Sequence, residues 1–326
     1  MKAIVYHDYG SPDVLRCEEI EKPSAGDDEV LIRVRAASVN PLDWRLMRGK
    51  PALARLMTGG LRKPKTTRPG VDMSGQVEAV GRNVKGFKPG DEVFGVCRGA
   101  FAEYACAIED RLALKPANIS FEEAAAVPVA AITALQGLRD RGRIQPGHKV
   151  LVDGASGGVG TFAIQLARLF GAEVTAVCST AKMETARSLG AEHVIDYTRG
   201  DFTRSGQRYD LIFAANAYHS IFDYRRALVR GGNYVMAGSS SWANILQAMS
   251  VGPLLSLVGS RKMRFFIARI IRTDLALLKD FLAAGKMVSV VDRRYPLSDV
   301  AEAVRYLEEG HARGKVIITF DGHDGR

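Results

Sequence analysis

The sequence predicts an α/β protein in which a β-rich part comes first and a doubly wound parallel sheet follows. Up to about Pro116 the chain reads as short strands separated by turns, with Pro-Gly pairs at 69–70 and 89–90. From Lys149 onward strand patterns alternate with helical patterns, which implies right-handed crossovers and a parallel sheet with helices on both faces. The chain's 326 residues are enough for two domains of ordinary size.

We expect the first part to form a compact β-barrel or rolled sheet. Five stretches in it have the pattern of short strands: KAIVYH, EVLIRVRAAS, GQVEAVG, DEVFGV and FAEYACA. The pattern changes at 120–123, SFEE, which is a capping box in front of an alanine-rich helical run interrupted at Pro128. A domain boundary is therefore expected near residue 120.

The second part is expected to alternate strands with helices. The strands are KVLVDGA, EVTAVC, HVIDY, DLIFAA and NYVMAG, and the segments between them include TFAIQLARLF, AKMETARSL and YHSIFDYRRALV. A further helix, TDLALLKDFLAAG, is followed by VSVVDRRYPL, by the helix SDVAEAVRYLEEG and by a last strand, KVIITF. The longest apolar stretch, 245–258, is too short to span a bilayer. The apolar segment 243–270 that contains it predicts either a substrate lid or a subunit contact.

Composition excludes several classes of function. The formal charge is +9, but lysine and arginine are spread along the chain without a dense basic run, so the charge favours an anionic cofactor over a nucleic acid. The four cysteines have no CxxC spacing and are expected to be reduced thiols. The first residues have neither the basic nor the apolar region of a secretion signal. We therefore expect a cytoplasmic protein.

The glycine-rich stretch 154–160, GASGGVG, is the strongest functional signal. It follows the apolar run 150–152 and precedes a helical pattern. Free backbone N–H groups and the positive end of the helix dipole at such a junction suit a pyrophosphate. The alternative is a tight turn that only lets the helix pack against the strand. Because the stretch stands between a strand and a helix, the sequence favours a dinucleotide site.

The end of the second strand of this part bears on the choice of dinucleotide. An acidic residue there would bind the ribose 2′-OH of NAD, but 178–182 reads CSTAK and holds no acid. A hydroxyl and an ammonium in this stretch would donate hydrogen bonds to the 2′-phosphate of NADPH, and Tyr197 could supply another donor. The alternative for Lys182 is a solvated residue on the first turn of the next helix. The sequence predicts NADPH as the cofactor.

Motifs along nearly the whole chain resemble the medium-chain dehydrogenase/reductase superfamily, in its quinone oxidoreductase-like branch. The matching stretches are VNPLDW, RPGVDMSGQVEAVG, PGDEVFG, GAFAEYA, VPVAAITALQGL, GASGGVGTFAIQLAR, LGAEHVIDY, GGNYVMAG and GKVIITF. The resemblance implies a GroES-like catalytic domain of residues 1–122 completed by 288–326, and a Rossmann NADP-binding domain of residues 123–287. It also implies an active site in the cleft between the domains and a homodimer.

The resemblance also bears on a catalytic metal. Zinc-dependent relatives place a cysteine, a histidine and a second cysteine at the positions that match Asn40, Val71 and Val129, none of which has a metal-binding side chain here. The lobe that holds a structural zinc is missing too. We therefore expect a zinc-free enzyme. Conjugated acceptors suit such an enzyme, because hydride attack on them gives a delocalised anion that hydrogen bonds can stabilise.

The resemblance assigns roles to individual residues. Asn40 would face the nicotinamide ribose and the substrate oxygen, although it could equally be an Asx-turn residue ahead of Pro41. Thr133 would lie beside the nicotinamide, or its hydroxyl would bond back to the preceding helical turn. The residues assigned to the cofactor's phosphates are Ser156, Gly157, Gly158, Val159, Ser179, Lys182 and Tyr197, and those that border its ribose and nicotinamide are Asn216, Gly238, Ser239, Gly314 and Lys315. Asn216 departs from the aspartate or glycine often found near there.

Two further residues of the VNPLDW stretch remain open. Asp43 is expected to be structural and to pair with an arginine across the cleft, and Trp44 to form either a pocket wall or part of the core. The function predicted is transfer of a hydride from NADPH to quinones or α,β-unsaturated carbonyls, small apolar substrates that need no metal. The alternatives are an NAD(P)-dependent alcohol dehydrogenase or aldehyde reductase, and a non-catalytic NADPH-binding regulatory protein.

Overall fold

The structure is a computed structural model that describes residues 1–50, 55 and 59–320. The chain divides into two compact units, Met1–Val129 with Ile270–Arg326, and Ala130–Arg269. The first division, after Val129, lies beyond the boundary expected at residue 122, and the second, before Ile270, lies ahead of the boundary expected at residue 288. The helix near residues 272–283 belongs to the first unit because it packs against that unit's strands, and Asn118 Nδ2 donates to Leu282 O at 3.1 Å.

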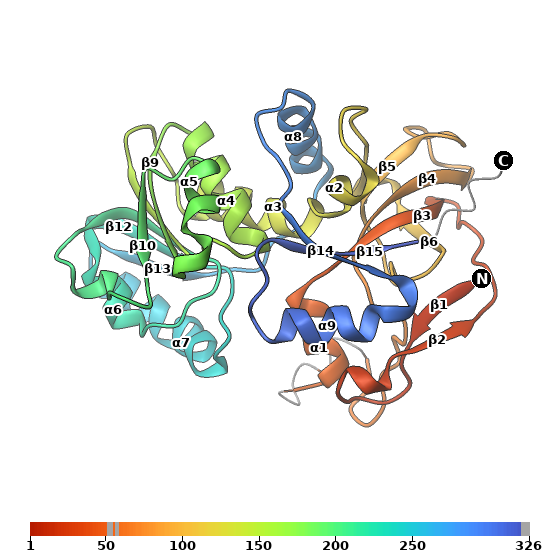
Figure 1. Ribbon diagram of the computed structural model, residues 1–326, viewed down its shortest axis with the longest axis horizontal. Helices are drawn as coiled ribbons and strands as arrows, with labels where there is room; N and C mark the ends of the chain where they lie inside the picture. Colours follow the sequence, from red (N-terminus) through yellow and green to blue (C-terminus); the bar gives the residue numbers. More distant parts are fainter. Residues whose placement is uncertain (51–54, 56–58, 321–326) are drawn as a thin grey trace. The chain divides into compact units, whose positions relative to one another are not determined.

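The first unit is built on a mixed sheet of seven strands, drawn from both ends of the chain (Figure 1). The strands are β3 (Glu29–Val39), β4 (Asp72–Val80), β5 (Glu92–Val96), β6 (Tyr104–Ile108), β7 (Leu112–Leu114), β14 (Val291–Pro296) and β15 (Lys315–Thr319). Their order is β14-β15-β3-β4-β5-β7, and β6 pairs with β3. Only the β14-β15 pairing is parallel. A separate antiparallel pair is formed by β1 (Lys2–Val5) and β2 (Arg16–Glu19).

Helices cover this sheet, and local sequence explains where they begin. They are α1 (Pro41–Arg48), α2 (Phe121–Ala125), α8 (Arg272–Ala283) and α9 (Val300–Glu308). The predicted capping box of α2 is confirmed: Ser120 Oγ accepts from Glu123 N at 3.1 Å, and Glu123 Oε2 accepts from Ser120 N at 2.8 Å. The chain leaves this helix before Pro128, where α3 (Pro128–Gln136) starts.

The second unit contains a parallel sheet of six strands. They are β8 (Lys149–Asp153), β9 (Glu173–Cys178), β10 (His193–Asp196), β11 (Tyr209–Ala214), β12 (Leu228–Met236) and β13 (Lys262–Phe265). The order β10-β9-β8-β11-β12-β13 runs outward in both directions from β8. Its helices are most of α3, then α4 (Gly158–Leu169), α5 (Met183–Ser188), α6 (Ile221–Arg226) and α7 (Trp242–Val258). The predicted α/β class with a doubly wound parallel sheet is confirmed.

The apolar segment 243–270 forms the helix α7 and the strand β13 (Figure 1). Sequence patterning missed β13, because its four residues KMRF alternate charged and apolar side chains over too short a stretch. The strand forms one edge of the parallel sheet. None of the helices in the described residues combines the length and the apolar character that crossing a membrane requires.

Candidate active site

The glycine-rich stretch forms a tight turn between β8 and α4 in the second unit. Gly154 has a φ of +74°, a conformation that favours glycine, and a Cβ there would come within 2.9 Å of Asn216 N. A Cβ on Gly160 would overlap the carbonyl oxygen of Gly154. The first amides of α4, from Gly158 onward, have no carbonyl partner within the helix. The turn therefore presents donors and the positive end of a helix dipole to an anion.

The other residues predicted to bind the cofactor in the second unit follow the carboxyl ends of neighbouring strands. Ser179 comes directly after β9, and Lys182 N donates to Ser179 O at 2.9 Å. Tyr197 follows β10, and its backbone N donates to Cys178 O at 3.2 Å. Residue 216 follows β11, and residues 238–239 follow β12, where Ala217 N donates to Gly238 O at 2.9 Å. The carboxyl edge of this sheet, at the switch in strand order, is where α/β proteins bind ligands.

Two residues at this edge were missed by the sequence analysis. Asp196, the last residue of β10, accepts hydrogen bonds from the hydroxyls of Thr180 and Thr198. Tyr218, after β11, lies with its ring centroid 5.8 Å from that of Tyr197. The only signal for them was their place at or near the end of a predicted strand. Thr133, predicted to be catalytic, lies half-buried on α3 in the same unit.

The first unit contains a buried polar cluster, which we define as Asn40, Asp43, Asp72 and Lys315. Their exposed fractions are 3, 6, 0 and 3%. Lys315 Nζ donates to Asn40 Oδ1 at 2.7 Å and lies 3.4 Å from Asp72 Oδ2. Asn40 Nδ2 donates to Asp72 Oδ2 at 2.9 Å and, more weakly, to Ser38 O at 3.4 Å. The structure thus brings Asn40 and Lys315 together, although 275 positions separate them in the chain.

Strand register and one helix cap build this cluster. β15 runs antiparallel to β3 with Val316 opposite Val39, so Lys315 lies next to the end of β3. β4 pairs with β3 on the other side, with Asp72 opposite Ser38. Asp43 closes the cap of α1, where its Oδ2 accepts from Asn40 N at 2.7 Å. Within the first unit the Asp43 carboxylate is held by the backbone N–H groups of Asn40 and Gly70, and its pairing with an arginine across the cleft stays a prediction.

Burial changes the ionisation of the cluster. It raises the pKa of Asp43 to about 7, with a smaller contribution from the nearby Asp72 carboxylate, while the Asn40 N–H opposes the rise. Burial lowers the pKa of Lys315, against the attraction of Asp72 and Asp43. The cluster therefore combines one carboxyl that titrates near neutral pH with one ammonium, beside an amide.

The cluster does not suit a zinc ion. The positions that match zinc ligands in zinc-dependent relatives do converge, because Asn40 Nδ2 and Val129 N both donate to Asp72, at 2.9 and 3.0 Å. A tetrahedral zinc needs several thiolate, imidazole or carboxylate ligands around one point. Here an ammonium lies 3.4 Å from the Asp72 carboxylate, which accepts from the Asn40 side chain. Across residues 1–50, 55 and 59–320, no three His, Cys, Asp or Glu side chains form a group that could hold a metal.

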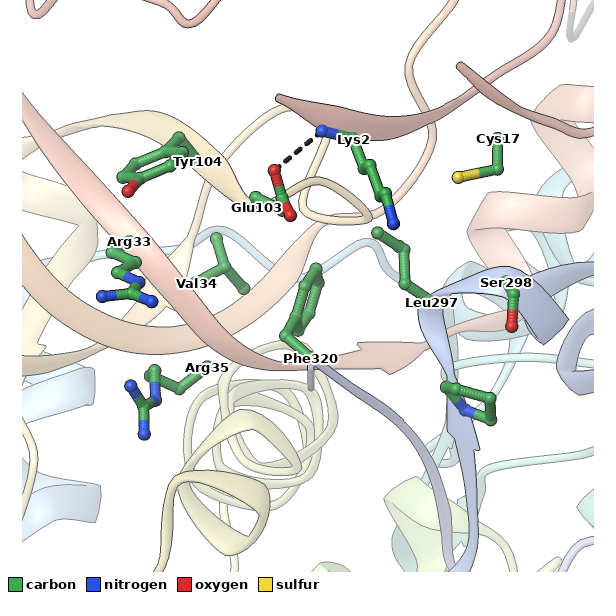
Figure 2. Close-up of a pocket in the computed structure, with 11 residues that line it drawn as sticks. Lys2, Cys17, Arg33, Val34, Arg35, Glu103, Tyr104, Leu297, Ser298 and Phe320 are labelled. Atoms are coloured by element: carbon green, nitrogen blue, oxygen red, sulfur yellow. Dashed lines mark hydrogen bonds between the residues drawn. The ribbon is translucent and has the colours of Figure 1, made fainter. Parts of the chain in front are cut away.

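A surface cavity of about 380 Å³ also lies in the first unit. Its lining residues are Lys2, Cys17, Arg33, Val34, Arg35, Glu103, Tyr104, Pro296, Leu297, Ser298 and Phe320. Figure 2 shows the Arg33 and Arg35 side chains pointing the same way, away from the Lys2 side chain. The Glu103 carboxylate accepts from Lys2 N at 2.8 Å. The cavity includes none of the residues predicted for the active site, and its cations do not converge on one point.

Family models match both parts of the chain. The alcohol dehydrogenase GroES-like domain matches residues 26–117, and a zinc-binding dehydrogenase domain matches residues 189–318. The first match confirms the GroES-like character expected of the N-terminal part. The second family is named for zinc binding, but the side chains around Asn40 described above do not suit a zinc ion.

Relatives and solved structures agree with these matches. The chain is 37% identical over 98% of its length to 2-methylene-furan-3-one reductase of Solanum lycopersicum, covering 79% of that protein. It is equally similar to the chloroplastic NADPH-dependent alkenal/one oxidoreductase of Arabidopsis thaliana, at 37% identity with the same coverage. The quinone oxidoreductase of Coxiella burnetii superposes with a TM-score of 0.86 at 28% identity, over 98% of this chain and 99% of that one.

The Escherichia coli quinone oxidoreductase, solved with NADPH, superposes with a TM-score of 0.81 at 26% identity, over 98% of this chain and all of that one. The strand order, the glycine turn and the conjugated substrates named for the relatives all support one family assignment. The chain belongs to the medium-chain dehydrogenase/reductase superfamily, in its quinone oxidoreductase-like branch.

Proposed function

We propose that the protein is an NADPH-dependent oxidoreductase that transfers a hydride to quinones or α,β-unsaturated carbonyls. The observation that carries this proposal is the glycine turn at the carboxyl edge of the parallel sheet, in a chain whose relatives include an alkenal/one oxidoreductase and quinone oxidoreductases. The second unit is proposed to bind the cofactor, and the first unit to act on the substrate.

The second unit fits the dinucleotide. The cradle at Gly154 and Gly160 has no room for a Cβ, which lets backbone amides approach a pyrophosphate. We assign the phosphates to Ser156, Gly157, Gly158, Val159, Ser179, Lys182 and Tyr197, and the ribose and nicotinamide to Asn216, Gly238, Ser239 and Gly314. Lys315 was expected beside the cofactor, but because it is only 3% exposed and bonds to Asn40 Oδ1 at 2.7 Å, we assign it to the polar cluster instead. When bound, NADPH supplies the hydride. Thr133 is proposed to orient the nicotinamide ring.

Asn40 is proposed to stabilise the negative charge that develops on the substrate oxygen. Its Nδ2 group makes one firm hydrogen bond to Asp72 and one weak bond of 3.4 Å to Ser38 O. A substrate oxygen can replace the weak partner without disturbing the firm one. Because Asn40 is almost fully buried, a single well-aimed donor there is worth more than it would be in water.

We also propose that this reaction needs no zinc. The donor set around Asn40 and Lys315 supports this, because a buried ammonium already supplies positive charge beside Asp72. The delocalised anion formed from an enone or quinone needs less stabilisation than the alkoxide formed from a simple aldehyde.

The deciding experiment is NADPH consumption with a panel of quinones, enones and aldehydes in the presence of a metal chelator. We expect turnover with the conjugated substrates and no effect of the chelator. Turnover confined to aldehydes and lost on chelation would identify an alcohol dehydrogenase instead. Tight NADPH binding without turnover over the whole panel would identify a binding protein.

A homodimer is proposed from the exposed apolar face of the second unit. Leu257 and Val258, at the end of α7, are 82 and 87% exposed. They lie beside β13, which is an edge strand of the parallel sheet. Exposed apolar surface next to an open strand edge is typical of a subunit contact. In sedimentation, L257D/V258D should be monomeric and wild type dimeric, while L61D, a matched change at exposed Leu61 of the first unit, should stay dimeric.

The compartment is proposed to be a reducing one such as the cytoplasm. All four cysteines are free thiols, and Cys17 is exposed. Several relatives are named as chloroplastic or mitochondrial proteins. Cell fractionation of the tagged protein distinguishes these locations.

A further inference from the structure

The buried polar cluster removes its charged side chains from water. Asp43, Asp72 and Lys315 are almost fully buried. Removing an ionised group from water is costly unless an opposite charge or several hydrogen bonds compensate it. Lys315 provides the only ammonium of the cluster, and the two carboxyls attract it. The three groups therefore depend on one another.

The ammonium also determines which way the Asn40 amide points. Lys315 Nζ lies 2.7 Å from Asn40 Oδ1, and Asp72 Oδ2 lies 2.9 Å from Asn40 Nδ2. An ammonium can only donate hydrogen bonds and a carboxylate can only accept them. A reversed amide would turn its NH₂ group toward the ammonium and its oxygen toward the carboxylate. Only one orientation of the amide satisfies both neighbours.

The backbone fixes the position of Lys315. Gly314 has a φ of +132°, and a Cβ there would overlap Val290 O. Lys315 N donates to Val290 O at 2.8 Å, and Nζ also lies 3.5 Å from Val39 O. Glycine is therefore required immediately before the lysine. The GK pair places an ammonium at the end of β3 rather than serving only as a turn.

We propose that Lys315 is a positioning residue that acts through Asn40. Its ammonium holds the amide in the orientation that directs Nδ2 toward the substrate oxygen, and it compensates Asp72, which holds the other side of the amide. This inference rests on the proposed function, in which Asn40 rather than Lys315 touches the reacting atoms.

The test is a double-mutant cycle on steady-state kinetics. In K315M, which keeps most of the side-chain volume without the charge, kcat should fall by about tenfold or more because the donor is misaimed. The Kd for NADPH, measured by fluorescence, should change by less than about twofold. K88M, a matched change at an exposed lysine of the same unit, should leave both values unchanged. N40A should lose about as much kcat as K315M, and N40A/K315M should lose no more than N40A.

Multiplicative losses in the double variant would overturn the proposal, because they would mean that Lys315 acts independently of Asn40. A rise in the NADPH Kd that accounts for the whole loss would overturn it too, in favour of a direct contact with the cofactor. Where K315M fails to fold, the cycle is run in D72N, since D72N/K315M removes the cation and the carboxylate together. The same non-additivity is expected in that background.

A readout independent of activity separates this inference from the proposed function. Wild-type protein that oxidises no NADPH with any quinone or enone would refute the proposed function. A crystal structure of K315M would still decide the inference: the Asn40 amide, whose oxygen has lost its ammonium partner, should shift from its wild-type position. An amide that keeps its place and its partner overturns the proposal.

Discussion

At the scale of single residues, the surroundings of Ser179 favour a phosphorylated ribose. Asp196 is an acid beside this position, paired with Cys178 in the sheet. Its oxygens already accept from Thr198 N at 2.9 Å, from Thr198 Oγ1 at 2.7 Å and from the Thr180 hydroxyl. The Nε of Arg199 lies 3.6 Å from it. A carboxylate with its lone pairs occupied is a poor partner for the ribose 2′-OH of NADH. Lys182, on the turn after Ser179, is therefore the cation that we propose for a 2′-phosphate.

Replacement of Lys182 by alanine should therefore discriminate between the two cofactors. A charge-assisted hydrogen bond to a phosphate contributes about 1.5–3 kcal/mol, so K182A should bind NADPH about tenfold or more weakly. NADH, which lacks the phosphate, should bind as before. Fluorescence titration of both cofactors measures this, and an equal loss for the two would contradict the assignment.

A second residue-scale feature is the carboxyl of Asp153, the last residue of β8 and the neighbour of the glycine turn. It accepts a hydrogen bond from the Tyr224 hydroxyl, and its Oδ1 has no partner among the described residues. Burial raises the pKa of Asp153 from 3.8 to about 7, although the Tyr224 hydroxyl and the Gly154 N–H oppose the rise. The folded protein therefore binds this proton more tightly than the unfolded chain does.

This pKa fixes the sign of a pH effect on stability. Between about pH 4 and pH 7 the folded state holds more protons than the unfolded state, so the free energy of unfolding falls as the pH rises through this window. D153N keeps an acceptor for Tyr224 and cannot ionise. Its free energy of unfolding relative to wild type should rise by a few kcal/mol between pH 4 and pH 8, as measured by urea unfolding. A difference that does not change with pH would mean that Asp153 is ionised throughout.

At the scale of elements, Gly160 at the start of α4 matters both for the packing of the helix and for the proposed binding of the cofactor. A Cβ on Gly160 would approach the Ala155 Cα to 2.7 Å and overlap Gly154 O. The helix therefore reaches the strand closely only when residue 160 has no side chain. The same close approach brings the first amides of α4 to the mouth of the turn.

In G160A the turn should open to admit the methyl group. We expect NADPH to bind about tenfold or more weakly and the Tm to fall by several degrees, corresponding to about 1–3 kcal/mol of overpacking. G200A is the matched control, because a Cβ on Gly200 would meet nothing within 4 Å and its φ needs no glycine. Calorimetry and titration test both variants. Unchanged NADPH binding in G160A would show that the close approach serves packing alone.

At the scale of the whole molecule, the features that the sequence predicts depend on local patterns, and those that it does not predict depend on contacts between distant residues. The capping box at Ser120, the glycine turn and the sheet class follow from residues a few positions apart. The polar cluster does not, because Lys315 reaches Asn40 only once β15 pairs with β3. The same holds for Asp196 and Thr180, which meet only where β10 lies beside β9. The sequence motifs identified each predicted site residue, but only the pairing of the strands shows which residues it contacts.

Hydrogen exchange with and without NADPH tests where the cofactor binds in the whole protein. The free amides at the start of α4 and the backbone near residues 178–182 and 196–198 should be protected, because a bound dinucleotide covers the carboxyl edge of the parallel sheet. The lining of the first unit's surface cavity, including residues 2, 33–35 and 103–104, should exchange as before. Protection confined to that lining would place the cofactor among its three cations and leave the glycine turn as a packing device.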